Sequence, residues 1–241
     1  MITGAVLAIT LGSFVAAFVN AAFATGGVYI VLFTSISVLP VSAAIPLQSA
    51  FAAASLLARI HYFWAHIDWR LVLGFALGGV LGVTFGTRTF VTLPETVILV
   101  MLGIVLLVLI WMPVTNWRPP IKHPFFFVGI LHSFLGAIFG VGGVLQPLLL
   151  RTSLTKAEIT GTLAACMLTL DVMKATGYVS FGFSYLDYIP HIIGATLAGF
   201  AGTWAGKRIS HRISEELFRR VFRVLVSVIA VRMIFQGLSA G

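Results

Sequence analysis

The sequence has few charged residues. Only 9% of its 241 residues are Asp, Glu, Lys or Arg, and 59% are hydrophobic, whereas about a quarter of a soluble domain is charged. The mean hydropathy is +1.07. No water-soluble core could bury this much apolar surface, and one spanning helix needs roughly 20 apolar residues. We therefore predict an integral membrane protein and exclude a soluble globular domain.

Several chemical signatures are absent as well. The single cysteine, Cys166, excludes an intrachain disulfide and a metal cluster built on cysteines. The sequence contains no Gly-x4-Gly-Lys-Ser/Thr motif for ATP phosphates, no His-Glu-x-x-His metal motif and no Gly-x-Ser-x-Gly nucleophile. We therefore predict that the protein is not an enzyme, does not use ATP itself and needs no cofactor or resident metal.

Basic residues outnumber acidic ones, fifteen Lys and Arg against seven Asp and Glu, for a net charge of +8. In a soluble protein this excess would suggest nucleic acid, but here the basic residues lie mostly between apolar segments, where they orient a membrane protein. We expect membrane lipid as a partner and no nucleic acid. A homo-oligomer remains an open alternative.

The apolar residues are grouped in long segments without the alternation of a membrane barrel. We therefore predict an all-α polytopic protein of the cell membrane, of the kind found in the bacterial inner membrane, in which the first segment is kept in the mature chain. The segments are Ile2–Leu39, Ala44–Tyr62, Leu71–Val91, Thr96–Val114, Pro124–Leu150, Ile159–Phe183, Ile189–Ala205 and Leu217–Leu238.

The two halves of the chain repeat each other. Phe23-Ala24-Thr25-Gly26-Gly27-Val28 recurs 116 residues later as Phe139-Gly140-Val141-Gly142-Gly143-Val144. A second pattern recurs after 120 residues. Because order and spacing both agree, we predict two membrane repeats, residues 1–117 and 118–241, joined by the linker Thr115–His123. The second pattern pairs Gly74, Gly79, Gly82, Gly86, Arg88 and Glu95 with Gly194, Gly199, Gly202, Gly206, Arg208 and Glu215.

The loop charges favour an inverted repeat. If the first and fifth segments each bend at their glycine pair and re-enter, each half crosses the membrane three times and the second half is inverted. All the basic loop residues except Arg88 then share one face, as the excess of Lys and Arg on cytoplasmic loops requires. We predict this arrangement, with both termini outside; the alternative is eight full spans with parallel repeats.

Taken together, the glycine pair in each half, the stretch from Gly177 to Asp187 and the glycine run ahead of Lys207-Arg208 resemble the sulfite exporter TauE/SafE family. The resemblance covers nearly the whole chain. It implies a membrane transporter of small sulfur-containing anions, such as sulfite or organosulfonates, with such an anion as the protein's partner. The alternatives are an intramembrane enzyme and a non-transporting subunit of a membrane complex.

A glycine pair inside an apolar helix points to a break, because glycine disfavours a helix by about 1 kcal/mol relative to alanine. A break frees backbone N–H groups at the positive end of the next half-helix, where an anion would satisfy them near the midplane. The alternative to anion binding at these glycine pairs is close packing of helices, which also uses glycine. For the second glycine pattern, close packing is the stronger interpretation. The predicted substrate-binding residues are Asn20, Thr25, Gly26, Gly27, Gln48, Ser49, His132, Gly142, Gly143, Gln146 and Thr162.

Asp171 and Lys174 stand three residues apart within the sixth segment and therefore share one helix face. Ionisable groups inside a span are usually functional or paired. We predict either a structural ion pair or a relay for a proton or the substrate.

Overall fold

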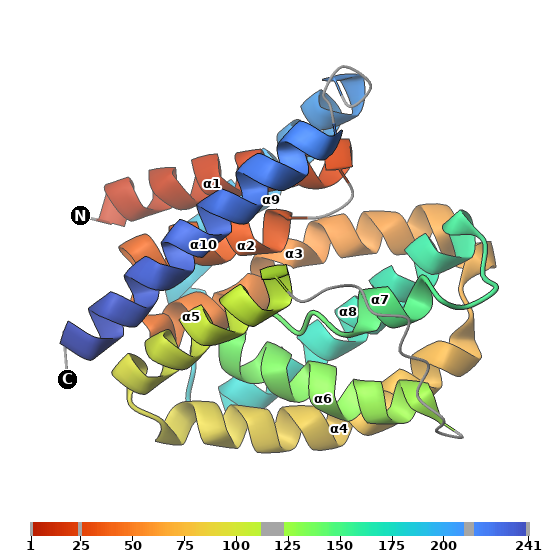
Figure 1. The fold of residues 1–241 in the computed structure, drawn as a ribbon, viewed down its shortest axis with the longest axis horizontal. Coiled ribbons are helices and arrows are strands. Elements are labelled where there is room, and N and C mark those ends of the chain that lie inside the picture. The colour runs from red at the N-terminus through yellow and green to blue at the C-terminus, as the bar shows by residue number, and fades with distance from the viewer. Residues whose placement is uncertain (1, 24–25, 112–122, 210–214, 240–241) are drawn as a thin grey trace. The chain divides into compact units, whose positions relative to one another are not determined.

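The computed structural model describes residues 2–23, 26–111, 123–209 and 215–239, and these residues form helices and short connections without a strand (Figure 1). Thr25 and residues 115–122 of the predicted linker lie outside the described residues. The elements are α1 (Ile2–Phe23), α2 (Gly27–Val38), α3 (Val41–Phe63), η1 (Trp64–His66), α4 (Trp69–Thr92), α5 (Glu95–Trp111), α6 (Pro124–Phe139), α7 (Leu145–Leu149), α8 (Lys156–Ser180), η2 (Leu186–Tyr188), α9 (Ile189–Ile209) and α10 (Glu215–Ser239).

Among the described residues, four helical stretches are long and apolar enough to cross a membrane, and the shorter helices α2, α5 and α6 are also apolar. Large apolar side chains on outward faces, such as Leu77 in α4 and Phe235 in α10, are more than half exposed, which is what lipid contact requires. The predicted all-α polytopic membrane protein is confirmed. The four stretches are Gly4–Ala21, Val41–His66, Trp69–Thr92 and Phe222–Ser239.

The first and fifth apolar segments are both interrupted at their glycines. In the first segment, α1 and α2 pack as an antiparallel pair, because Gly27 lies against Asn20 while Gly12 lies against Thr34. In the fifth segment, α7 turns back onto α6 through contacts with His132. The inversion of the repeats and the depth of these pairs in the membrane stay predictions.

The chain divides into two compact units, and each unit takes helices from both halves of the sequence. These units are defined by contacts in space and not by sequence similarity, so the predicted sequence repeats, 1–117 and 118–241, stay a prediction. Unit 1 comprises Met1–Phe51, Leu93–Met112 and Ser184–Gly241, and unit 2 comprises Ala52–Thr92 and Pro113–Phe183.

In unit 1, α9 packs along α1 through glycines. A Cβ atom at Gly202 would collide with the carbonyl oxygen of Phe14, and one at Gly206 with that of Phe18. Such backbone contact is how membrane helices approach closely. The predicted packing role is confirmed here, although Gly199 on the same helix faces open space.

Unit 2 repeats this contact with helices of the opposite halves, as α4 packs along α6 (Figure 1). A Cβ atom at Gly82 would collide with the carbonyl oxygen of Ile130, and one at Gly86 would come within 2.9 Å of the carbonyl oxygen of Phe134. The glycines of α4 and α9 are 120 residues apart, and the facing carbonyls of α6 and α1 are 116 residues apart. The offsets of the sequence repeat therefore reappear as matching contacts inside the two units.

Candidate functional site

The first break lies in unit 1 between α1 and α2. Gly26 adopts a left-handed conformation with φ of 99°, which glycine tolerates without a Cβ penalty. Asn20 accepts the backbone N–H of Gly27 through Oδ1 at 2.9 Å. The first amide of α2 is therefore already satisfied by a side chain of the preceding helix.

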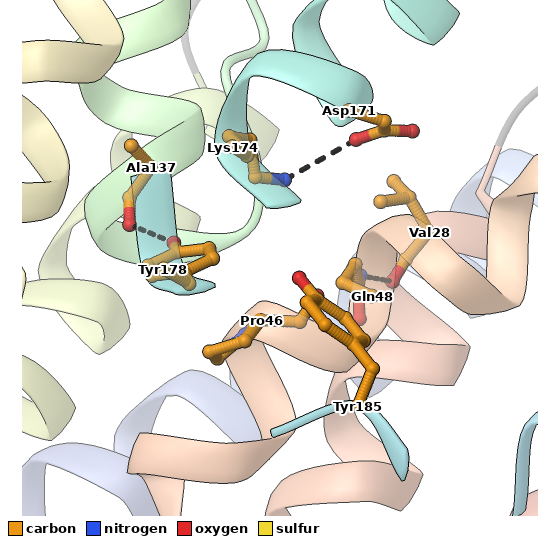
Figure 2. Close-up of polar contacts among 8 residues, drawn as sticks. All are labelled: Val28, Pro46, Gln48, Ala137, Asp171, Lys174, Tyr178 and Tyr185. Carbon is orange, nitrogen blue, oxygen red and sulfur yellow. Dashed lines mark hydrogen bonds and ion pairs between the residues drawn. The ribbon is translucent and has the colours of Figure 1, made fainter. Parts of the chain in front are cut away.

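Gln48 in α3 reaches the first turn of α2. Its Nε2 donates to the carbonyl oxygen of Val28 at 2.9 Å (Figure 2). Its Oε1 and the hydroxyl of the neighbouring Ser49 are buried and have no hydrogen-bond partner among the described residues. The first break thus carries an unpaired acceptor on Gln48 beside a fixed helix start.

The second break lies in unit 2 and follows α6. Gly140 and Gly143 are both left-handed, with φ of 73° and 67°. Val141 and Gly142 lie between them and are buried, and their backbone N–H groups have no acceptor within the described part of the chain. Buried N–H groups without a partner are rare because they lose hydration without compensation. These two amides are therefore candidates for contact with a bound anion.

The helix that follows this break is shorter than expected. The apolar segment extends to Leu150, but α7 has only five residues, Leu145–Leu149. A single turn cannot sum the peptide dipoles of a long half-helix. The expected helix-dipole contribution is therefore present only after the first break, in the twelve residues of α2.

His132 in α6 is bound to the second break through its ring. Nδ1 accepts the backbone N–H of Val144 at 3.2 Å and that of Leu145 at 3.1 Å. Since Nδ1 is the acceptor, the ring proton is on Nε2, and this N–H has no acceptor among the described residues. A Cβ atom at Gly142 would lie 2.5 Å from Nε2, so the glycine allows the ring to lie against the break.

The other predicted residues of unit 2 are less directly involved. The hydroxyl of Thr162 is fully buried and accepts the backbone N–H of Asp68 at 2.9 Å, which connects α8 to the start of α4. Gln146 is half-buried in α7, and no hydrogen bond of its side chain lies within the described residues. Thr162 is therefore a structural contact here.

Lys174 and Asp171 form an ion pair on α8, with Nζ 3.3 Å from Oδ1 (Figure 2). The side chain of Lys174 is only 2% exposed and that of Asp171 is 15% exposed. The predicted pairing of these residues is therefore present in the structure.

The structure brings the predicted residues together in two sets. Asn20, Gly26, Gly27, Gln48 and Ser49 belong to unit 1. The second set, in unit 2, contains His132, Gly142, Gly143, Gln146, Thr162, Asp171 and Lys174.

Two tyrosines were not predicted from the sequence. The hydroxyl of Tyr178 donates to the carbonyl oxygen of Ala137 in the last turn of α6, and that of Tyr185 donates to the carbonyl oxygen of Pro46 at 3.2 Å (Figure 2). Tyr178 follows Lys174 by four residues and so shares its helix face. That spacing is the signal that could have identified Tyr178.

Metal binding finds no support in the described residues, where no group of three or more His, Cys, Asp or Glu side chains comes together. A surface hollow of about 430 Å³ is lined by the α3–α4 connection and Glu158, and it contains none of the predicted site residues. The two breaks therefore remain the candidate site.

The chain is similar to known membrane proteins. Residues 9–233 match the family described as "Sulfite exporter TauE/SafE". A "Probable membrane transporter protein" of Xylella fastidiosa (strain 9a5c) is 24% identical over 205 residues, which cover 78% of this chain and 77% of the relative. No solved structure matches the chain. Because the family match extends over nearly the whole sequence, this multi-pass membrane protein belongs to the sulfite exporter TauE/SafE family.

Proposed function

We propose that this protein is a secondary transporter that moves small sulfur-containing anions, such as sulfite or organosulfonates, across the membrane. The family to which the chain belongs is named for sulfite export, and its Xylella relative is named as a membrane transporter. Within the described residues no cluster of metal ligands suggests a catalytic metal centre. Transport therefore accounts for the chain better than catalysis does.

One observation carries the proposal for where the anion binds. At the second break, the buried amides of Val141 and Gly142 and the Nε2–H of His132 are all donors without acceptors in the described residues. An oxyanion is an acceptor on every side and would satisfy such a group of donors. We therefore place the anion at Val141, Gly142, Gly143 and His132.

The first break is proposed to contribute less to anion binding than the second break. Its leading amide already binds Asn20, and Gln48 presents an oxygen that would repel an anion. The hydroxyl of Ser49 can donate, and the positive end of α2 adds a favourable field. Gly26, Gly27 and Ser49 therefore remain proposed contacts of lesser weight, while Asn20 holds the break in shape.

Flux through the purified protein tests the transport function. Proteoliposomes containing this chain alone should take up labelled sulfite or a labelled sulfonate faster than empty liposomes. Chemical turnover of the anion without flux would instead indicate an intramembrane enzyme. The absence of both would indicate a subunit of a larger complex.

A glycine substitution tests the binding place. Gly142→Ala would push a methyl group to 2.5 Å from the ring of His132 and should strongly reduce uptake. Gly74→Ala is the matched control in the same unit, because its Cβ would lie 3.7 Å from the nearest atom, in Phe125. Equal uptake by the two variants in folded protein would refute the second break as the anion site.

A further inference from the structure

We propose that Lys174 is the fixed positive charge that binds the transported anion, and that Asp171 is the resting counter-ion which the anion replaces. This inference rests on the proposed transport function and names the charged group of its site. Nothing in the family match or the relative's name assigns a role to either residue.

The environment of Lys174 is unusual for a structural lysine. Its side chain is 2% exposed, yet its three ammonium protons have one hydrogen-bond partner among the described residues, Asp171. The Nζ–Oδ1 distance of 3.3 Å is longer than the 2.7–2.9 Å typical of strong charge-assisted bonds. A buried ammonium so weakly held has unused capacity for a further acceptor.

The position of Lys174 on α8 places it beside the second break. Leu170, Lys174 and Tyr178 are spaced by four residues and therefore share one face of the helix. Leu170 lies against Gly136, and Tyr178 donates to the carbonyl oxygen of Ala137. Lys174 lies between these two contacts, so it faces the last turn of α6, which ends at the break.

Lys174 and the second break together present hydrogen-bond donors and a positive charge. Lys174 shares the face of α8 that contacts Gly136 and Ala137 of α6, and His132 lies one helical turn before Gly136. The ring of His132 lies against Gly142, whose amide has no acceptor in the described residues. The ammonium, the imidazole N–H and the amide are all donors, so their common ligand is an anion.

Stability alone gives little reason to bury this pair. An ion pair removed from water gains little net free energy, because the loss of hydration offsets most of the attraction. An i,i+3 pair could equally form on a solvent-facing side of the helix. Burial is useful if the partner of the Lys174 ammonium is exchanged during transport. An entering anion can replace a carboxylate oxygen of Asp171 beside the ammonium, so the positive charge of Lys174 always has a negative partner.

Four variants in proteoliposomes test the proposal. Lys174→Met should raise the KM for sulfite about tenfold or more, as expected for the loss of one charge-assisted contact. Lys174→Arg should retain part of the affinity because the charge remains. Asp171→Asn should keep or improve the affinity because the competing carboxylate is removed. Lys156→Met is the matched control, since it removes an exposed lysine at the start of the same helix.

The double variant Lys174→Met/Asp171→Asn keeps the test decisive if Lys174→Met does not fold. It removes both charges, so no uncompensated charge is left buried, and it should fold but fail to bind the anion. Wild-type affinity in Lys174→Met, or normal uptake by the double variant, would overturn the proposal and make the pair structural. Absence of uptake by the wild-type protein would instead refute the transport function itself.

Discussion

His132 and Leu145 are joined by a hydrogen bond in which the imidazole Nδ1 accepts the backbone N–H of Leu145 at 3.1 Å. The same nitrogen also accepts the N–H of Val144. One side chain of α6 therefore fixes the chain where it resumes after the second break, and it leaves its Nε2–H available for a ligand. His132 therefore has both a structural role at the break and a proposed role in binding the anion.

Replacement of His132 should affect stability and transport differently. His132→Ala leaves the N–H groups of Val144 and Leu145 without their acceptor and should lower the free energy of unfolding by about 1–3 kcal/mol. His132→Gln restores an acceptor and should recover part of that loss. Thermal unfolding in detergent measures the stability, and sulfite uptake in liposomes measures the function.

Leu131→Val is a suitable control for this series, because Leu131 is the preceding residue and is 49% exposed. Its unfolding temperature and uptake should both match the wild-type protein. If His132→Ala unfolded at the wild-type temperature, the imidazole would not be holding the break.

Substitution of the glycines in α4 and α9 should change stability by different amounts, depending on whether each glycine contacts the facing helix. Gly82→Ala and Gly202→Ala each force a methyl group into a backbone carbonyl of the facing helix and should cost about 1–3 kcal/mol. Gly199→Ala meets nothing within 4 Å and should be neutral or stabilising by up to about 1 kcal/mol. Thermal unfolding of the three purified variants checks this order.

The sequence was sufficient to predict the helical membrane fold and the position of the two breaks. The breaks were visible because left-handed residues such as Gly26 and Gly140 require glycine. The partners of the glycine helices could not be predicted, since a pattern of small residues indicates close packing without indicating which helix packs there. The contacts of Gly82 with α6 and of Gly202 with α1 needed coordinates.

The polar residues near the breaks were predicted by type but not by direction. Asn20 and His132 were predicted to bind the anion, and the structure shows that each also accepts a backbone N–H group, through Oδ1 and Nδ1. Both side chains contain an acceptor and a donor, so sequence alone could not decide which end faces the break. The shortness of α7 was not predicted either, because the apolar segment continues beyond the end of the helix at Leu149.

Two substitutions of Asn20 can show whether the first break faces the transported anion. Asn20→Ala removes the acceptor of the Gly27 N–H and should lower stability by about 1 kcal/mol. Asn20→Asp keeps an acceptor but adds a negative charge at the positive end of α2, so it should preserve stability and reduce uptake. Uptake at the wild-type level in a stable Asn20→Asp protein would show that the anion does not approach this break.

Acid should weaken the start of α8 through Glu158, which precedes the apolar run beginning at Ile159. The side-chain hydroxyl of Thr155, and then its backbone N–H, donate to this carboxylate and lower the pKa of Glu158 below its ordinary value. A lowered folded-state pKa means that the stabilisation is present above the unfolded-state pKa and is lost as pH falls through the folded-state value.

Glu158→Gln isolates this contribution, because glutamine does not titrate. The difference in unfolding temperature between the wild-type protein and Glu158→Gln should be largest near neutral pH and should shrink below about pH 4. A difference that stayed constant down to about pH 3 would show that the carboxylate at Thr155 does not contribute as a charged group.

A site with one ammonium should select its substrates by charge. If Lys174 is the counter-charge, a monovalent sulfonate makes a neutral pair with it, whereas a divalent anion leaves one negative charge uncompensated where the dielectric constant is low and Asp171 is near. Methanesulfonate should therefore compete with labelled sulfite more effectively than sulfate does, in uptake measured over a range of competitor concentrations. Lys174→Met should reduce this preference, because the monovalent anion then has no partner charge either. Stronger competition by sulfate in the wild-type protein would require a second cation at the site, and the single-charge assignment would then be wrong.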